Sequence, residues 1–163
     1  MIDISAKPGN NSLQDGKQIS VQRIYIKDCS FESPRAPAVF SSPIEPELTI
    51  NMRSDTNKLE NDTYEVVLTI TLEAQSDNRS IFLVEVHQAG LFAIRGFSDQ
   101  ELGALLGSYC PNLLFAYARQ AVSDLAQKGG MPMVLLQPVN FDAIYLQSIA
   151  KTHNPSGDTS IPA

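Results

Sequence analysis

Hydrophobic and polar residues alternate most regularly between Thr63 and Gln75. One phase holds Tyr64, Val66, Leu68, Ile70, Leu72 and Ala74, and the other holds Glu65, Val67, Thr69, Thr71 and Glu73. A period of two residues predicts a β-strand with one buried face and one largely solvated face.

Three further stretches carry weaker alternation and also predict strands: 18–31, 48–52 and 80–94. In the first, Ile19 and Val21 are in one phase and Ile24 and Ile26 in the other, so we expect a bulge at Gln22–Arg23. The polar residues 76–79 predict a hairpin turn. Four strands joined mostly by short links indicate an antiparallel sheet.

The helical stretches follow the strands, so the fold class is α+β. Residues 98–107 predict a short helix, because Ser98 and Glu101 have the capping-box spacing. A main helix is expected from Pro111 to Lys128, and a last one over 140–151. In the main helix one stripe comprises Leu114, Tyr117, Ala118, Ala121 and Leu125, and three apolar residues fall outside it: Leu113, Phe115 and Val122. A helix with two apolar sides is expected to pack on its own sheet and against a partner.

Two segments are more apolar than connectors and surface helices need. Residues 32–46 contain four prolines together with Val39, Phe40 and Ile44, and the last helix carries Phe141, Ile144 and Tyr145. The two segments either cover the sheet or form an apolar groove for an extended peptide.

Composition narrows the class of partner. The 163 residues suit one domain, expected over 18–151, between a disordered lead (1–17) and a flexible tail (152–163). A formal charge of −6 argues against nucleic acid and allows a basic partner; the acidic residues on the strands are Asp28, Glu32, Glu65 and Glu85. No apolar run reaches the length of a membrane span, and the start lacks a signal core, so we expect a cytoplasmic protein without membrane insertion.

No motif for catalysis is apparent. His87 and His153 are the only histidines, no metal-ligand spacing occurs, and neither a nucleophile elbow nor a phosphate loop is present. Cys29 and Cys110 lie far apart in the sequence, and a reduced compartment is expected. We therefore expect no enzyme, no metal and no cofactor.

Several stretches together resemble the SecB family of protein-export chaperones. They are QRIYIKDCSFESPRAP, PELTINM, TYEVVLTITLEA, FLVEVHQAGLFAI, LGSYCPNLLFAYAR and PVNFDAIYL, in the family's order from about Gln18 to Ala150. The resemblance implies a four-stranded antiparallel sheet packed against a long helix, with a second C-terminal helix. It also implies a homotetramer, a dimer of dimers, that holds precursor proteins unfolded in the cytoplasm and delivers them to the SecA motor without a cofactor.

The resemblance also implies roles for particular residues. The client groove would comprise Val39, Phe40, Ile44, Phe141, Ile144 and Tyr145. The SecA-binding face would comprise Asp28, Glu32, Leu83 and Glu85. The oligomer interface would comprise Val84, Val86, Gln88, Leu114, Tyr117 and Ala121.

Two departures and two rival functions remain. Ile44 stands where the family has an aromatic residue, which would weaken aromatic stacking, and the tail carries one carboxylate side chain, Asp158, so a tail contact with SecA is in doubt. One rival is a SecB-like chaperone of a toxin–antitoxin system. The other is a small-molecule binding domain, which a pocket with convergent polar groups would favour over an open apolar channel.

Overall fold

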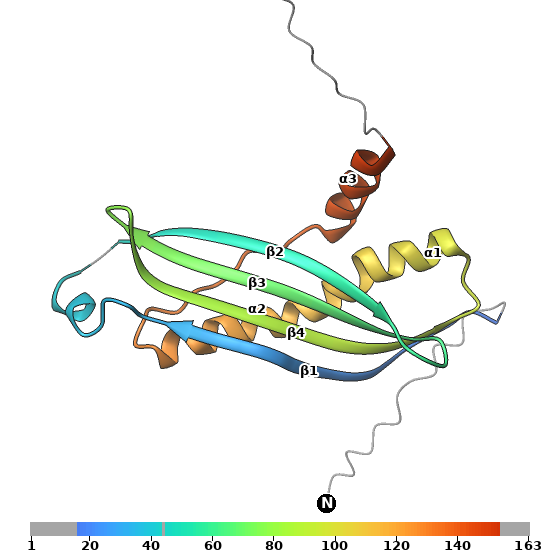
Figure 1. Cartoon of the computed structure of the whole chain (residues 1–163), viewed down its shortest axis with the longest axis horizontal. Helices are drawn as coiled ribbons and strands as arrows, with labels where there is room; N and C mark the ends of the chain where they lie inside the picture. The colour runs from blue at the N-terminus through green and yellow to red at the C-terminus, as the bar shows by residue number, and fades with distance from the viewer. Residues whose placement is uncertain (1–15, 44, 154–163) are drawn as a thin grey trace, which may run out of the picture.

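The computed structural model describes residues 16–43 and 45–153, and a four-stranded antiparallel sheet forms its centre (Figure 1). The strands are β1 (Gln18–Glu32), β2 (Glu47–Lys58), β3 (Thr63–Ser76) and β4 (Arg79–Arg95), in the order β1-β4-β3-β2. The predicted α+β class and the antiparallel sheet are therefore confirmed.

The alternation along β3 has the predicted consequence. Every residue of its apolar phase from Tyr64 to Ala74 is buried, and most of the other phase is partly exposed. Asp77 and Asn78 close the β3–β4 hairpin with φ angles of 52° and 56°, the left-handed conformation that tight two-residue hairpin turns require. The expected bulge in β1 is present between Val21 and Arg23, and a second irregularity lies between Ile26 and Asp28.

Strand β2 is longer than its apolar pattern indicates. The sequence predicts 48–52, whereas the ladder to β3 continues to Lys58, which pairs with Tyr64. β2 is an edge strand, and its second half is polar on both faces. The apolar pattern reports burial, so it cannot detect pairing that continues without burial.

The two helices expected at 98–107 and 111–128 form one continuous helical segment. It comprises α1 (Asp99–Ala104), a π-helical turn η2 (Leu105–Tyr109) and α2 (Cys110–Lys128). The Ser98–Glu101 capping box begins it as predicted. The break expected between residues 107 and 111 does not occur. The π turn accommodates Pro111, because the N–H of Cys110 donates to the carbonyl of Leu105 and the proline that follows has no N–H that needs a partner.

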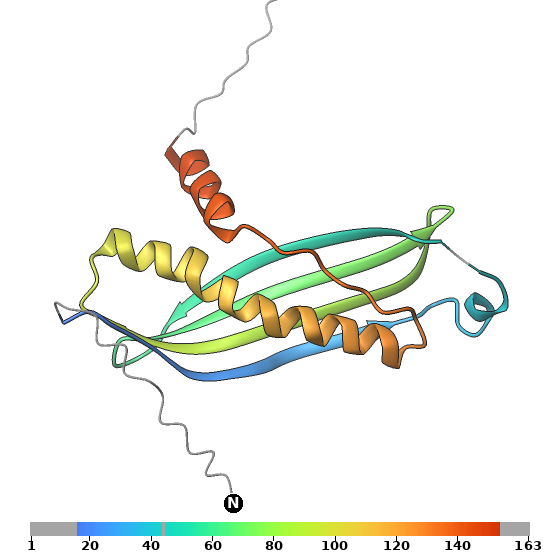
Figure 2. The same ribbon diagram turned by 180° about the vertical axis from the view of Figure 1, so that it is seen from behind.

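Helix α2 crosses the back of the sheet and contacts β4, β3 and β1 (Figure 2). Its buried side chains include Leu114, Phe115, Ala118, Val122 and Ala126. The predicted stripe is thus rotated: Phe115 and Val122 face the core, and Tyr117 is exposed. The helix carries two overlapping apolar stripes that share Leu114 and Ala118, and periodicity alone does not tell which one meets the sheet.

After α2 the chain forms a connector, residues 131–140, without helix or strand, and then α3 (Phe141–His153). Asn140 caps α3 by accepting a hydrogen bond from the N–H of Ala143 at 3.0 Å. The buried ring of Phe141 packs edge-on against Phe115, with centroids 5.7 Å apart. The helix extends to His153, two residues beyond its expected end at residue 151. The lead up to residue 15 and the tail from residue 154 lie outside the described residues.

Candidate functional site: an apolar groove and a polar sheet face

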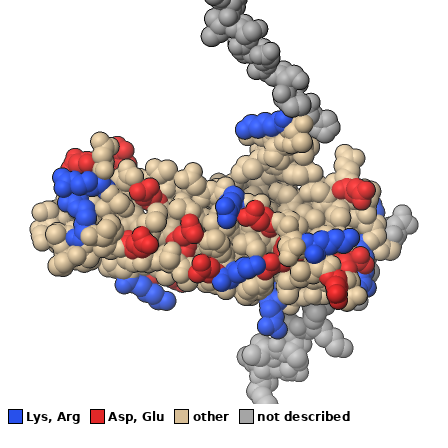
Figure 3. Space-filling model, in the orientation of Figure 1, with Lys and Arg blue, Asp and Glu red and all other residues tan. Residues whose placement is uncertain are grey.

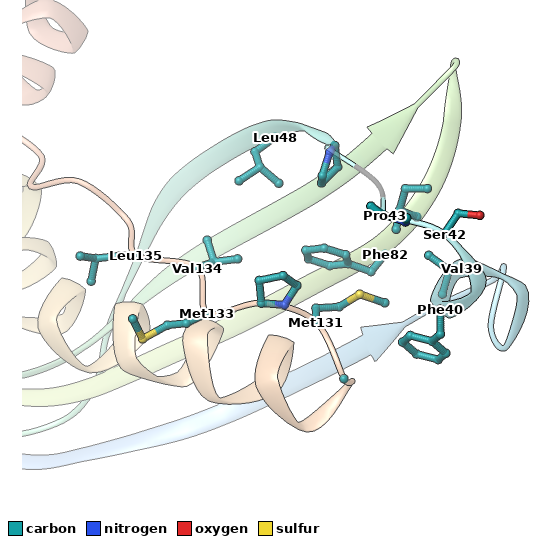
Figure 4. Close-up of a pocket in the computed structure, with 14 residues that line it drawn as sticks. Val39, Phe40, Ser42, Pro43, Leu48, Phe82, Met131, Met133, Val134 and Leu135 are labelled. Carbon is teal, nitrogen blue, oxygen red and sulfur yellow. The ribbon is translucent and has the colours of Figure 1, made fainter.

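An apolar groove of about 520 Å³ lies at the end of the sheet where β1 leaves and β2 enters (Figure 4). One wall is the segment that crosses from β1 to β2, with the short 3-10 helix η1 (Ala38–Ser41). The opposite wall is the connector, and β2 and β4 contribute Leu48 and Phe82. Ser42 has the only polar side chain among the described lining residues. The groove therefore offers apolar contact with few directional demands.

Only part of the predicted client groove is found here. Val39 is buried at its base, and Phe40, 56% exposed, lines its rim. Ile44 lies outside the described residues, so the structure does not place the subsite that its side chain would form.

The three predicted residues of α3 are not in this groove. Phe141 is 6% exposed and belongs to the core, and Ile144 is an exposed residue of α3. The ring of Tyr145 lies against Gly103 and Gly107 of the helical segment. In the single subunit the last helix does not line this groove, because the connector provides its second wall, so the expected pairing of the loop with the last helix stays a prediction.

The residues that sequence reasoning missed are those of the connector. Met131, Met133, Val134 and Leu135 line the groove, and Met133 and Leu135 are 66% and 63% exposed. A high density of apolar residues in a segment without period two or 3.6 is the signal that could have identified them, because such residues are not explained by a strand or a helix face.

The four predicted SecA-binding residues share one face of the sheet, the face that looks away from α2. Glu32 pairs with Leu83 across the β1–β4 ladder, Ser30 pairs with Glu85, and Asp28 pairs with His87. Cross-strand partners point to the same side, so alternation and register bring these side chains together. Figure 3 shows that this face carries both acidic and basic side chains, so it is charged rather than uniformly acidic.

Glu85 is held by neighbours on this face. The His87 Nε2 lies 2.8 Å from Glu85 Oε1, and the hydroxyl of Thr71 donates to Glu85 Oε2 at 3.2 Å. These hydrogen bonds, that of His87 first, lower the pKa of the Glu85 carboxyl below its ordinary value. The carboxylate is thus fixed in the charged form with both oxygens engaged, and its side chain remains 41% exposed.

Within the single subunit, most of the residues predicted for the oligomer interface lie in the core. Val84, Val86 and Leu114 have no exposed surface in the single subunit, so their side chains belong to its core. Gln88 is also buried, and its amide donates to the Tyr25 carbonyl at 3.0 Å. Tyr117 is 51% exposed.

Tyr117 and the half-buried Ala121 line a second groove, of about 500 Å³, between β1 and α2. Its lining from β1 includes Ile26, an exposed apolar residue. An uncovered apolar surface here agrees with the expectation that α2 packs against its own sheet on one side only.

The two cysteines are free in the described structure. Cys110 is buried, and desolvation raises the pKa of its thiol to about 12, so it is an inert core residue. Residues 16–43 and 45–153 contain no cluster of His, Cys, Asp and Glu that could hold a metal ion. Within the same ranges, every helix is too short or too polar to cross a membrane.

Comparisons with known proteins agree with this arrangement. A family model described as preprotein translocase subunit SecB matches residues 12–152. A Methylococcus capsulatus protein named protein-export protein SecB is 49% identical over 136 residues, which are 83% of this chain and 88% of that protein. A Pseudomonas syringae protein of the same name is 40% identical over 159 residues, 96% of each chain.

A solved structure shares the fold. The Mycobacterium tuberculosis Rv1957 SecB-like chaperone, in complex with a peptide from the HigA1 antitoxin, aligns with a TM-score of 0.57 at 18% identity, over 74% of this chain and 87% of that chain. The family match over most of the chain, and a relative that is 49% identical over 83% of it, show that this chain belongs to the SecB family of protein-export chaperones.

Proposed function

We propose that this protein is an ATP-independent holding chaperone, which keeps precursor proteins unfolded in the cytoplasm and delivers them to the SecA translocation motor. SecB is a family of chaperones and not of enzymes, and the proteins that share 40–49% identity with this chain carry the name protein-export protein. The observation that carries the proposal is the groove between the β1–β2 segment and the connector, with exposed Phe40 and Met133 on its rim.

The groove suits an unfolded polypeptide better than a polar small molecule. Burial of apolar area contributes about 25 cal/mol per Å² whatever the order of the client's side chains, so many sequences can bind. A folded protein hides such segments, which gives a preference for unfolded clients without a recognition code. The described lining residues lack the convergent polar groups with which a metabolite site fixes its ligand.

Assembly is the second part of the proposal. A second copy would cover the groove between β1 and α2, around Tyr117, and two such pairs would make a homotetramer. Several client grooves on one particle can engage one long chain, and linked sites raise the apparent affinity by about 10²–10⁴.

Delivery is the third part. SecA would dock on the sheet face that holds Asp28, Glu32, Leu83 and Glu85, away from the client groove. A separate docking face lets SecA bind a loaded chaperone and then compete for the client, so release needs no nucleotide on this protein.

The test of the client groove is the double variant Phe40→Asp with Met133→Asp. Two carboxylates on the rim would have to be desolvated by a bound client, so we expect a loss of more than about tenfold in client affinity and of aggregation suppression. Leu59→Asp, at an exposed apolar residue beyond the far end of β2, is the control and should behave as the parent. Light scattering of a diluted denatured client measures the effect, and unchanged suppression by the double variant would remove the groove assignment.

The test of the docking face is Glu85→Lys, with Glu60→Lys in the β2–β3 connection as the charge-matched control. We expect Glu85→Lys to bind SecA more weakly and Glu60→Lys to bind SecA as the parent does. Neither variant should change client binding, and calorimetry with each partner measures both. An equal loss of both activities would count against a separate docking face.

A toxin–antitoxin role is the less favoured alternative. The solved SecB-like chaperone with an antitoxin peptide shares only the fold, whereas relatives at much higher identity carry export names.

A further inference from the structure

His87 lies on the same sheet face as the predicted docking residues but is not one of them. Its side chain is 23% exposed and lies beside Glu85, with Nε2 2.8 Å from Glu85 Oε1. A carboxylate can only accept, so Nε2 carries a proton and donates. The other ring nitrogen, Nδ1, lies 3.5 Å from the hydroxyl of Thr69, which can donate to it.

This arrangement fixes the direction of Glu85. Two residues apart on one strand, Glu85 and His87 point to the same side of the sheet, and β3 places Thr71 opposite Glu85 and Thr69 opposite His87. Both carboxylate oxygens therefore have a donor from the subunit itself, while the carboxylate stays accessible. The Glu85 side chain is therefore already ordered before a cationic side chain of the partner binds, so binding costs less conformational entropy.

Charged groups surround the imidazole from each strand of the sheet, and α2 lies on the opposite face. They are Glu85 on β4, Asp28 and Lys27 on β1, Glu65 on β3, and Arg53 and Asp55 on β2. Lys27 pairs with Glu65 at 2.9 Å and Arg53 with Asp55 at 3.1 Å, so both cations already have a carboxylate partner. Near His87 this leaves the carboxylate of Glu85, which Arg53 also attracts, and that of Asp28, the cross-strand partner of His87.

We propose that His87 is a positioning residue of the docking face: its neutral imidazole holds the Glu85 carboxylate ready for a cationic side chain of the partner, and a second proton on the ring turns that support into competition. The inference rests on the proposed docking of SecA and adds its regulation by pH. A protonated imidazole forms its own ion pair with Glu85 and adds one positive charge beside Asp28. The face then attracts a basic partner less strongly.

Histidine is the side chain whose charge responds to pH near neutrality. One added positive charge close to a docked cation weakens binding by about five- to tenfold. SecA binding should therefore weaken as the pH falls from 8 to 5.5, and binding of an unfolded client at the distant groove should not follow the same course.

The experiment measures the dissociation constant of purified SecA from the full chain at pH 8 and pH 5.5. His87→Gln keeps a side-chain N–H donor for Glu85 and does not titrate, whereas His87→Ala removes the donor. We expect His87→Gln to match the parent at pH 8 and to bind about fivefold more tightly than the parent at pH 5.5. His87→Ala should be about threefold weaker than the parent at pH 8.

His153→Gln is the matched control, since His153 is the other histidine of the chain, and it should retain the parental pH profile. Because the same SecA is used throughout, its own titration cancels in the ratio of variant to parent. A ratio for His87→Gln that stays constant across the pH range would overturn the inference and leave the docking face standing. Absence of SecA binding at every pH would overturn the proposed docking and the inference with it.

Discussion

Tyr25, Lys27 and Glu65 form a small hydrogen-bonded cluster on the polar face of the sheet. The phenol of Tyr25 donates to Glu65 Oε1, and the ammonium of Lys27 lies 2.9 Å from both carboxylate oxygens. Burial, and then the hydrogen bond to Glu65, raise the pKa of Tyr25 to about 12, because both disfavour the phenolate. The cluster links β1 to β3 across the intervening strand β4.

This raised pKa predicts a defined loss of stability in alkali. Below about pH 10 the phenol is protonated in the folded and unfolded chain, and the Tyr25–Glu65 hydrogen bond contributes about 1 kcal/mol. Between about pH 10 and 12 the unfolded chain releases the proton more readily, so the free energy of unfolding falls as pH rises. Urea unfolding of the parent and Tyr25→Phe from pH 8 to 11 should show the parent's advantage shrinking above pH 10; a constant difference would contradict this account.

At the scale of elements, the sequence predicts the strands and helices that bury one face, and it misses features that depend only on backbone geometry. β3 and β4 are evident from their alternation, since one face of each lies in the core. The apolar pattern does not reveal the second half of β2, because those residues pair with β3 but stay exposed. It does not reveal the π turn either, because one extra residue in a single turn hardly changes the spacing of apolar residues. The orientation of α2 was ambiguous because either apolar stripe could have met the sheet.

Because α3 packs on the π turn, Gly107→Ala should affect the stability of the whole fold and the attachment of α3 in different ways. A Cβ at Gly107 would lie 2.4 Å from Tyr145 Cδ2, too close for the ring to stay in place. Alanine also favours the helix by about 0.5–1 kcal/mol over glycine. We expect the free energy of unfolding to be kept or slightly raised, while α3 loses amide protection in hydrogen exchange.

The double variant Gly107→Ala with Tyr145→Ala removes the clash together with the ring. It should leave α3 no less protected than Tyr145→Ala alone. Unchanged protection of α3 in Gly107→Ala would show that Tyr145 does not hold the helix there.

At the scale of the whole molecule, the described residues of one subunit leave apolar grooves open, among them the proposed client groove and the groove between β1 and α2. The sequence indicated both by their excess of apolar residues. It could not assign Phe141 to the core or the connector to the groove, because those depend on where the chain runs after α2. Likewise, Val84 and Val86, which the resemblance implied for the oligomer interface, lie in the core phase of β4, and only the three-dimensional structure shows that they are fully buried within one subunit.

Tyr117→Asp tests the role of the surface beside α2. Burial of a carboxylate against a second copy is unfavourable, so we expect the mass in light scattering to fall from an assembly to a smaller species, with the circular dichroism of the fold retained. Ile144→Asp, at an exposed apolar residue on α3, is the control and should keep the parental mass. A parental mass for Tyr117→Asp would place the subunit contact elsewhere.

One wall of the proposed client groove is a stretch of chain, 132–135, that belongs to no ladder and no helical turn. Met131 anchors the start of this wall, because it is buried and its N–H donates to the Ala126 carbonyl at 3.0 Å. Beyond it the wall can be reshaped without breaking helix or ladder hydrogen bonds, and the exposed side chain of Met133 is flexible. The opposite wall and the floor are anchored to a rigid sheet. The groove therefore has one flexible wall, which can close on a small side chain such as valine or move apart for a large one such as tryptophan. The width of the groove then adapts to each client segment that binds.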